Sequence, residues 1–400
     1  MLNRRQFLTL SGGAAVTGAA AWAGLVRDRG TTTPGGSSPS PANPSSVLVV
    51  VQLSGGNDAL NTVIPHDGRY HDLRPTLGIP DDKLVALTNV TTVGLHPALQ
   101  PLLPLWDAGQ LAILPQIGFA ADSRSHFESL AAWWTASPEH RQTTGWIGRW
   151  LDATGAAKDN PLAAIALGGN GVPALRAEHS ASTVVNDLAG FKVMSSRVGD
   201  AFAAMAQPVS SDPMLSQAQQ AVGAATKAVS LLSQAAAPPS SETGPITESL
   251  TTAATMIGMN LGTRVFLVGG SGFDTHANQA ADHEQLLGDL ATGVSSFFTA
   301  LEASGHADDV LLLTTSEFGR RAAQNGSDGS DHGHGGVQFV AGRKVHGGLH
   351  GEIDLGHLVD GDLAAAVDTR SLYAVALDWL GGPSAELLDG HTDTYGLLTA

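Results

Sequence analysis

Carboxylate and imidazole side chains stand beside several short apolar runs of this sequence, in positions where they could share one metal site. Carboxylate oxygens and imidazole nitrogens are ligands that suit Zn²⁺, Mn²⁺ or Mg²⁺. The chain has no cysteine, so a metal must be held by histidine, aspartate or glutamate. Each residue alone also fits a turn or a helix cap, and their joint placement favours the metal interpretation. The candidate ligands are Asp58, Asp274, His276, Glu317, His332 and His334.

Hydroxyl groups at the start of an expected helix are the candidate nucleophiles. Ser123 and Ser125 lie between an apolar run at residues 111–117 and a helical pattern over residues 126–135. The partial positive charge at a helix N-terminus favours an alkoxide and then a bound phosphoryl group. Arg124 offers a guanidinium fork that matches the oxygens of a phosphate. The alternative is that these serines only cap the helix.

Strand-like and helix-like patterns alternate along the chain, which predicts a wound α/β sheet. The run at residues 47–53 is apolar and rich in valine, as expected for a strand buried on both faces of a parallel sheet. Such sheets bind ligands beyond the carboxyl ends of their strands, so the candidate residues should converge on one crevice. Further strands are predicted at 111–117, 163–167, 265–268, 310–313 and 337–340, and helices at 98–108, 126–135, 214–236, 283–304 and 371–380.

The segment from about residue 200 to 260 departs from this alternation. It is rich in Ala, Gln and Ser and is interrupted by Pro238 and Pro239, so we interpret it as a helical insertion. No second low-complexity linker divides the remainder of the chain. Residues 47–400 are therefore predicted to form one domain, a mostly parallel sheet flanked by helices.

The N-terminal segment has the pattern of an export signal. Arg4 and Arg5 precede a Gly/Ala-rich run without charge, and this order resembles a twin-arginine signal over residues 1–30. Such a signal is read by the twin-arginine translocase and predicts a location outside the cytoplasm: periplasmic, cell-wall-associated or secreted. The run is too weakly apolar for a stable membrane anchor, which is the alternative. Residues 31–46 hold mostly Thr, Pro, Gly and Ser and are predicted to be a disordered linker.

The charge of the chain limits its partners. The first 30 residues hold four of the 21 basic residues and one of the 37 acidic residues, so the exported part would keep 17 basic and 36 acidic side chains. A protein this acidic is a poor candidate for binding nucleic acid or an anionic membrane.

Seven short blocks of the sequence together resemble the DUF1501 family of exported bacterial proteins. This family is grouped with the alkaline phosphatase-like clan, beside sulfatases and cofactor-independent phosphoglycerate mutases. The blocks stand in the family's order between about residues 47 and 382, and the segment of about 200–259 carries none of them. The blocks are Gly55-Gly56-Asn57-Asp58-Ala59-Leu60-Asn61, His96-Pro97-Ala98-Leu99, Ser123-Arg124-Ser125-His126-Phe127, Thr144-Gly145-Trp146, Phe273-Asp274-Thr275-His276, Thr315-Ser316-Glu317-Phe318-Gly319-Arg320 and Asp331-His332-Gly333-His334-Gly335.

The resemblance implies an alkaline phosphatase-like fold and a two-metal crevice with a hydroxyl nucleophile at a helix start. Asp58 would match the clan's first metal-binding aspartate. Asp274 and His276 would match its Asp/His pair for one metal, and Glu317 stands where an aspartate supports the other. The nucleophile would be Ser123 or Ser125.

Two departures from the clan's pattern affect the implied metal sites. His332 or His334 would be the clan's late histidine, but Phe318 stands where clan enzymes usually have another imidazole. The spacing from Asp274 to His276 is also shorter than the clan's usual Asp-x-x-x-His. These departures predict that one of the two metal sites is altered, weakened or absent.

The leading hypothesis is an exported metal-dependent hydrolase of phosphate or sulfate esters that forms a covalent seryl intermediate. Its partner would be an anionic ester, either a small molecule or a group carried on a polymer. The chain lacks the Cys/Ser-x-Pro/Ala-x-Arg context from which sulfatases make formylglycine, which disfavours a sulfatase of the usual kind. The alternative is a non-catalytic exported binding or assembly protein that has lost part of the metal site, and Phe318 favours it. The sequence does not specify the substrate, the metal or the oligomeric state.

Overall fold

The computed structural model describes residues 45–119, 123–168, 172–185 and 244–399, with a few isolated residues between 204 and 226. The predicted signal, nearly all of the predicted linker and most of the predicted helix at 214–236 lie outside the described residues. In the described part of the chain, no helix combines the length and apolar character needed to cross a bilayer.

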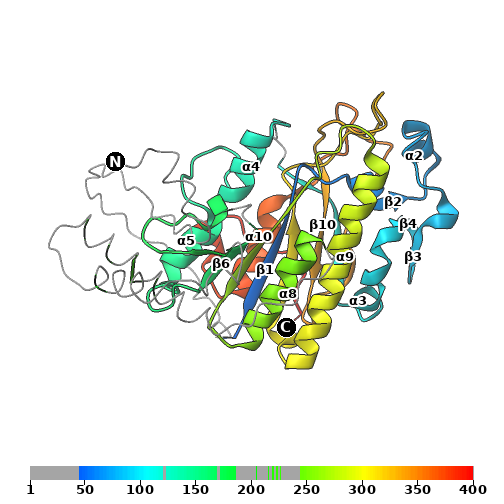
Figure 1. The fold of residues 1–400 in the computed structure, drawn as a ribbon. Helices are drawn as coiled ribbons and strands as arrows, with labels where there is room; N and C mark the ends of the chain where they lie inside the picture. Colours follow the sequence, from blue (N-terminus) through cyan, green and yellow to red (C-terminus); the bar gives the residue numbers. More distant parts are fainter. Residues whose placement is uncertain are drawn as a thin grey trace, which may run out of the picture.

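A nine-stranded sheet forms the centre of the described part of the molecule (Figure 1). Its strands are β1 (Val47–Ser54), β5 (Leu111–Gly118), β6 (Ala164–Leu167), β7 (Thr183–Val185), β8 (Val265–Ser271), β9 (Val310–Thr315), β10 (Gly336–Ala341), β11 (Gly348–Leu349) and β12 (Val367–Asp368). They are ordered β11-β5-β10-β9-β1-β8-β6-β7, and β12 also pairs with β5. Within this sheet β10 runs antiparallel to both neighbours, and the other pairs are parallel.

The central strand β1 shows how the sheet joins the two layers that cover it. Val49 and Val51 point to one face and belong to one hydrophobic cluster, whereas Leu48 and Val50 point to the other face and belong to a second cluster. This alternation follows from the two-residue period of a strand. These four side chains are at most 2% exposed, and burial of each contributes about 1.5–3 kcal/mol.

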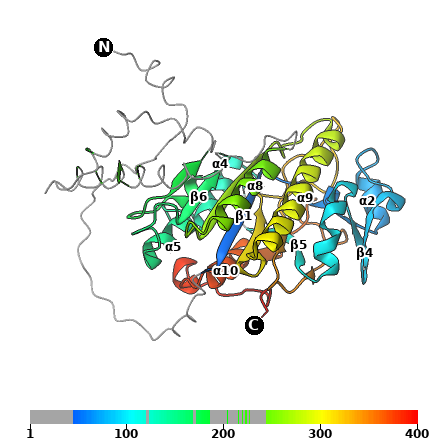
Figure 2. The same cartoon turned by 60° about the horizontal axis from the view of Figure 1, so that its bottom comes forward.

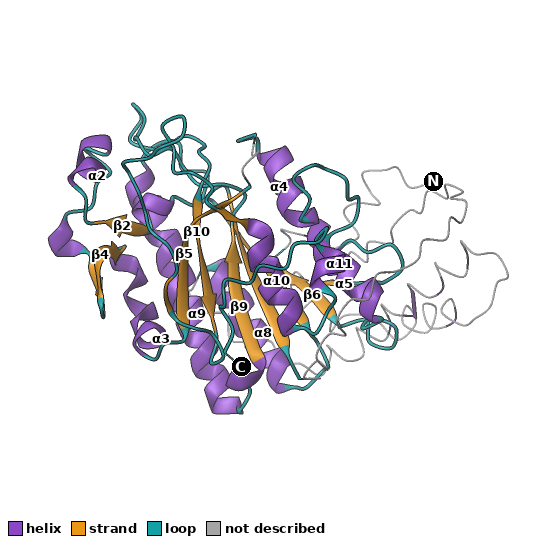
Figure 3. Ribbon diagram, turned by 180° about the vertical axis from the view of Figure 1, so that it is seen from behind, coloured by secondary structure: helices purple, strands orange, loops and turns teal. Residues whose placement is uncertain are grey.

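Helices cover both faces of the sheet. One face packs against α8 (Pro245–Gly258) and the long helix α9 (Gln279–Ser304), which lie side by side in front of the sheet in Figures 1 and 2. Figure 3 shows the opposite face, covered by α5 (Trp146–Thr154), α10 (Thr369–Trp379) and α11 (Ser384–Leu387), with α4 (His126–Thr135) above them. The predicted α/β architecture, a mostly parallel sheet flanked by helices, is confirmed.

A small antiparallel sheet lies to one side of the main sheet. It contains β2 (Val63–Pro65), β3 (Val85–Leu87) and β4 (Val90–Leu95), and α2 (Gly68–Leu73) lies beside it (Figure 1). The remaining elements are η1 (Ala59–Asn61), η2 (Asp81–Lys83), η3 (Pro97–Leu102), α3 (Leu103–Asp107), η4 (Val172–Leu175) and η6 (Ala307–Asp309).

All six predicted strands and the helix predicted at 126–135 are present in the structure. The six predicted strands correspond to β1, β5, β6, β8, β9 and β10, and the helix predicted at 126–135 is α4. The helix predicted at 98–108 is divided into η3 and α3, because Pro101 and Pro104 lack the amide donors of a regular helix. The last part of the predicted insertion forms α8, which packs against β8 and α9.

Candidate functional site

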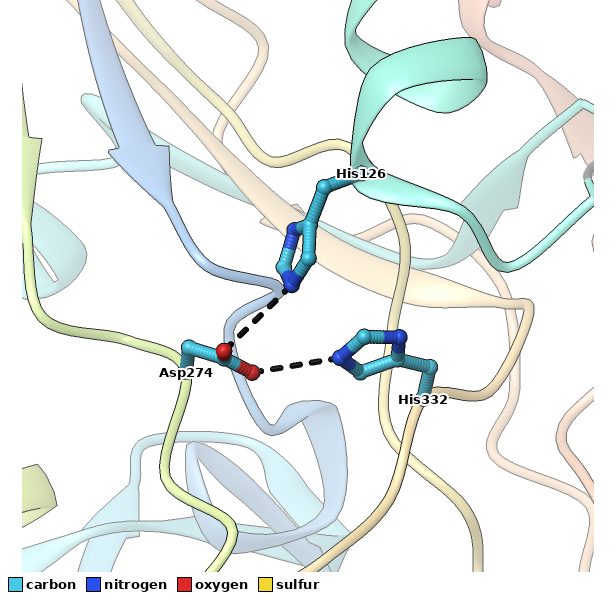
Figure 4. A group of neighbouring side chains, drawn as sticks. All are labelled: His126, Asp274 and His332. Atoms are coloured by element: carbon cyan, nitrogen blue, oxygen red, sulfur yellow. Dashed lines mark hydrogen bonds and ion pairs between the residues drawn. The ribbon is translucent and has the colours of Figure 1, made fainter.

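Three ligand-type side chains from separate segments converge at the carboxyl end of the central strands (Figure 4). His126 is the first residue of α4, Asp274 follows β8, and His332 lies in the loop before β10. His126 Nε2 is 3.4 Å from Asp274 Oδ2, and His332 Nε2 is 3.1 Å from Asp274 Oδ1. One ligand atom from each residue lies within 4.8 Å of the others, so the three face a common point.

A third imidazole extends this cluster. His276 Nε2 lies 3.0 Å from Asp274 Oδ1 and 2.9 Å from His332 Nε2, and His276 Nδ1 contacts Asp331 Oδ1 at 3.0 Å. Ligand atoms about 2.1 Å from a tetrahedral zinc ion stand about 3.4 Å from one another. Asp274 Oδ1, His276 Nε2 and His332 Nε2 lie 2.9–3.1 Å apart, slightly closer than that spacing, and His126 Nε2 lies 3.4 Å from the other oxygen of Asp274. Imidazole nitrogens and a carboxylate gathered this closely are donors that suit a divalent metal.

Glu317 orients His126 from behind. Its Oε1 contacts His126 Nδ1 at 2.9 Å and accepts a hydrogen bond of 2.8 Å from the amide of Gly55. This hydrogen bond raises the pKa of His126 above its ordinary value. A carboxylate on Nδ1 leaves Nε2 free to face the candidate metal position, an arrangement that is common for metal-bound histidines. Within the described residues, His126 Nε2 and Glu317 Oε2 are buried atoms without a hydrogen-bond partner, which fits a cation-binding role for this cluster.

Arg320 fixes the position of Asp274. The guanidinium is fully buried and donates to Asp274 Oδ1 at 2.7 Å and to the carbonyls of Gly56 and Ser330 at 2.7 and 2.8 Å. Partial burial alone would raise the pKa of Asp274, but the hydrogen bonds from Arg320 and His332 lower that pKa to about 2. The carboxylate is therefore ionised and ready to bind a cation at neutral pH.

The glycine pair after β1 permits the close approach of three loops. Gly55 has a φ of 123°, and a Cβ at this residue would lie 2.3 Å from the amide nitrogen of Asp274. Gly56 has a φ of 79°, and its Cβ would lie 2.3 Å from the ring of Phe318. A side chain at either residue would push the loop after β1 away from the site.

Asp58 has a different environment from the other candidate ligands. Its carboxylate is fully buried and forms two hydrogen bonds with Arg74, at 2.5 and 2.9 Å, and it also accepts from Gln279. Oδ1 additionally caps η1 by accepting from the amides of Leu60 and Asn61. The structure brings Asp58 to the same end of the sheet but surrounds it with donors, so we do not include it in the proposed ligand set.

His334 and Arg124 form the wall of an adjoining pocket. Arg124 Nε donates to His334 Nε2 at 3.0 Å, and Arg124 Nη2 is 2.9 Å from Asp362 Oδ2. The main-chain oxygen of Arg124 contacts His332 Nδ1 at 2.9 Å, which joins the pocket to the candidate metal cluster. Of the two candidates for the late histidine, the geometry favours His332, because Nε2 of His334 faces Arg124.

The two candidate nucleophiles differ in their access to this pocket. Ser123 is exposed and lines it. Ser125 is the N-cap residue of α4, does not line the pocket, and donates its amide hydrogen to Ser123 Oγ at 3.2 Å. The arrangement therefore favours Ser123 as the residue that meets a bound substrate.

Phe318 contributes a wall rather than a ligand. Its ring is fully buried, with centroids 4.9 Å from His126 and 4.6 Å from His332. An apolar ring at this position lowers the polarity around both imidazoles but supplies no metal ligand. The departure seen in the sequence thus falls directly beside the candidate metal cluster.

Sequence reasoning missed several residues that shape the site. His126 stood inside a recognised block, but it looked like the first residue of a capped helix. Arg320 and Asp331 also stood in recognised blocks without an assigned role. Arg74 and Asp362 carried no local signal, because each has its effect through partners distant in sequence.

The sequence model of a known protein family matches residues 121–399, which include all three residues of the candidate metal cluster. The family is DUF1501, described as a protein of unknown function. The chain belongs to the DUF1501 family. No curated protein matches it in sequence.

Solved structures with a related arrangement share little sequence with this DUF1501 chain. A protein in the alkaline phosphatase superfamily from Vibrio parahaemolyticus has a TM-score of 0.41 and 8% identity, over 89% of this chain and 71% of that one. The lipoteichoic acid synthase LtaP from Listeria monocytogenes has a TM-score of 0.37 and 9% identity, over 88% and 74%. The PsFucS1 sulfatase from Pseudoalteromonas sp. has a TM-score of 0.37 and 14% identity, over 88% and 72%. Similarity at this level carries no information about activity.

Proposed function

We propose that this protein is a metal-dependent hydrolase of phosphate or sulfate esters that acts outside the cytoplasm. The observation that carries the proposal is the convergence of His126, Asp274 and His332 on one point beside an open pocket lined by Ser123 and Arg124. The proposal of export is based on the sequence alone, because the twin-arginine pattern lies outside the described residues.

The proposed metal ligands are His126, Asp274 and His332, with His276 as a further ligand. Glu317 would act through His126 by holding the tautomer that presents Nε2. When bound, a divalent cation would supply positive charge that polarises the ester and stabilises the developing negative charge. This mixed ligand set suits Zn²⁺, Mn²⁺ or Mg²⁺, because imidazole favours Zn²⁺ and carboxylate favours Mn²⁺ and Mg²⁺.

Ser123 is the proposed nucleophile, and Arg124 is the proposed clamp for the anionic oxygens of the ester. The Ser123 Oγ–phosphorus or Oγ–sulfur bond would form as the bond to the alcohol oxygen breaks, and the serine proton would end on the released alcohol. Water would then cleave the seryl ester, restoring the hydroxyl and releasing phosphate or sulfate. The start of α4 adds a partial positive charge near these oxygens.

Metal content and turnover of matched variants test the proposal. Asp274→Asn is expected to lose most of the bound metal and most of the turnover, because the neutral amide removes the negative charge that Asp274 would give to the cation. Ser123→Ala should retain the metal and lose turnover of an aryl phosphate or sulfate. His357→Asn is the control, since His357 is exposed and its ion-pair partner is Asp354, which is not one of the proposed ligands. If wild-type protein binds no metal after incubation with Zn²⁺ and Mn²⁺, the proposed metal site is refuted.

The second candidate function is a binding or assembly protein with an incomplete metal site. The specific observations that favour it are the apolar Phe318 beside the histidines and the pairing of Asp58 with Arg74. Metal-loaded protein that hydrolyses neither class of ester would support this function over hydrolysis.

A further inference from the structure

The pocket beside the metal cluster is larger than one phosphate or sulfate group requires. Its volume is about 610 Å³, within the range of roughly 300–1,000 Å³ typical of sites for organic ligands. If the anionic end of an ester lies at the metal and Arg124, the rest of this space is available to its alcohol part. The lining residues are Ser123, Arg124, His334, Val359, Asp360, Ala364 and Ala365.

A short hairpin holds one acidic side chain at the wall of this pocket. Val359 and Asp362 exchange two backbone hydrogen bonds, of 2.9 and 3.0 Å, around Asp360 and Gly361. Asp360 has a φ of 54° and Gly361 a φ of 82°, as in a type I′ turn. Arg321 donates to the carbonyl of Asp360 at 2.7 Å and so anchors the turn. The Asp360 carboxylate is thus presented to the pocket by an ordered turn, with 81% of its side chain exposed.

The two carboxylates of the hairpin are not equally neutralised. Asp362 is fully buried, 2.9 Å from Arg124 and 3.5 Å from Arg321. Asp360 is 4.0 Å from the same Arg124 nitrogen, so its charge is less compensated. Among the described lining residues, Arg124 is the only Lys or Arg, and Ala364 and Ala365 are small and apolar. An alcohol part with its own negative charge would therefore meet repulsion from Asp360.

We propose that the pocket binds the alcohol part of the ester and that Asp360 selects neutral or positively charged alcohols over anionic ones. The proposal rests on the proposed hydrolase function and names its substrate class. The overall charge of −16 acts in the same direction, because it disfavours polyanionic substrates. A charge about 6 Å from an exposed carboxylate changes affinity by about three- to tenfold.

Binding of non-hydrolysable phosphonates tests this selectivity without turnover. Three alkylphosphonates of equal chain length, ending in a methyl, a carboxylate or a trimethylammonium group, would be titrated calorimetrically into Zn²⁺- or Mn²⁺-loaded protein. We expect the carboxylate ligand to bind about three- to tenfold more weakly than the methyl ligand, and the trimethylammonium ligand to bind at least as tightly. Asp360→Asn should abolish the difference, because asparagine tolerates the left-handed turn and removes only the charge.

Asp82→Asn is the matched control, since Asp82 is an exposed carboxylate in η2 that does not line the pocket. It should leave the order of the three affinities unchanged. If all three ligands bind equally, or if Asp360→Asn preserves the discrimination, the selectivity is refuted and the hydrolase proposal stands. If no phosphonate binds the metal-loaded protein and no ester is hydrolysed, the proposed function fails and the selectivity fails with it.

Discussion

Replacing Arg74 by methionine is expected to destabilise the protein strongly, because it leaves the carboxylate of Asp58 buried without its counter-ion. Both side chains are fully buried, and the guanidinium bonds the carboxylate at 2.5 and 2.9 Å. Arg74 also donates to Asn61 Oδ1 at 2.7 Å and to the carbonyls of Ala322 and Arg321, both at 2.9 Å. Methionine keeps much of the apolar volume but supplies none of these hydrogen bonds.

The expected cost is about 4 kcal/mol in the free energy of unfolding. Removing one partner of a buried ion pair typically costs about 3–5 kcal/mol. That is a large part of the roughly 5–15 kcal/mol by which a domain is stable. Combining Arg74→Met with Asp58→Asn should cost about 2 kcal/mol less than the sum of the single changes, because the double variant has no unpaired charge.

Urea unfolding of the single and double variants measures these energies. Arg343→Met is the control, since Arg343 is 39% exposed and its contacts with Glu302 and Asp308 are 3.3 and 3.4 Å, so about 0.5 kcal/mol or less is expected. A loss below about 1 kcal/mol for Arg74→Met would refute the buried-pair argument. If Asp58→Asn releases the metal without loss of stability, Asp58 is a ligand, as the family resemblance implied.

The same pair predicts a dependence of stability on pH. Burial alone would raise the pKa of Asp58, but Arg74 lowers it below the ordinary value of 3.8. A group with a lowered folded-state pKa stabilises the protein above its unfolded pKa and loses this contribution as the pH falls through the folded value. Unfolding measured below about pH 4 should therefore be less pH-dependent in Asp58→Asn than in the wild type. An unchanged acid dependence in the variant would contradict this assignment.

Three further outcomes are expected. Replacing Arg4 and Arg5 together by lysine should leave precursor in the cytoplasm on fractionation, and normal export of this variant would exclude the twin-arginine assignment. Gly55→Ala should lower the free energy of unfolding, measured by thermal unfolding, clearly more than Gly155→Ala. Gly155 also has a positive φ but no atom near its Cβ, so its replacement should cost about 1 kcal/mol. Equal losses would exclude the steric argument. Glu317→Gln should weaken metal binding by about 10- to 100-fold in a competition titration, and unchanged affinity would show that this carboxylate does not orient the site.

The sequence by itself determined the main strands and part of the candidate site. Runs such as residues 310–313 are recognisable because both faces of a central strand are buried, so apolar residues follow one another. Asp274 and His276 could be assigned to the site because they follow a strand whose carboxyl end faces it. The absence of cysteine restricted metal ligands to imidazole and carboxylate groups.

Only the tertiary structure decided which of the candidates meet. A parallel strand at 336–341 would have put His332, which precedes it, at the opposite edge of the sheet from Asp274; the strand is antiparallel, and this brings the two together. The sequence did not show that Asp58 is paired with Arg74, or that Glu317 contacts Nδ1 of His126, which looked like an ordinary helix start. Strand direction and the partner of a buried charge depend on contacts between residues far apart in the chain, and local sequence patterns do not encode such contacts.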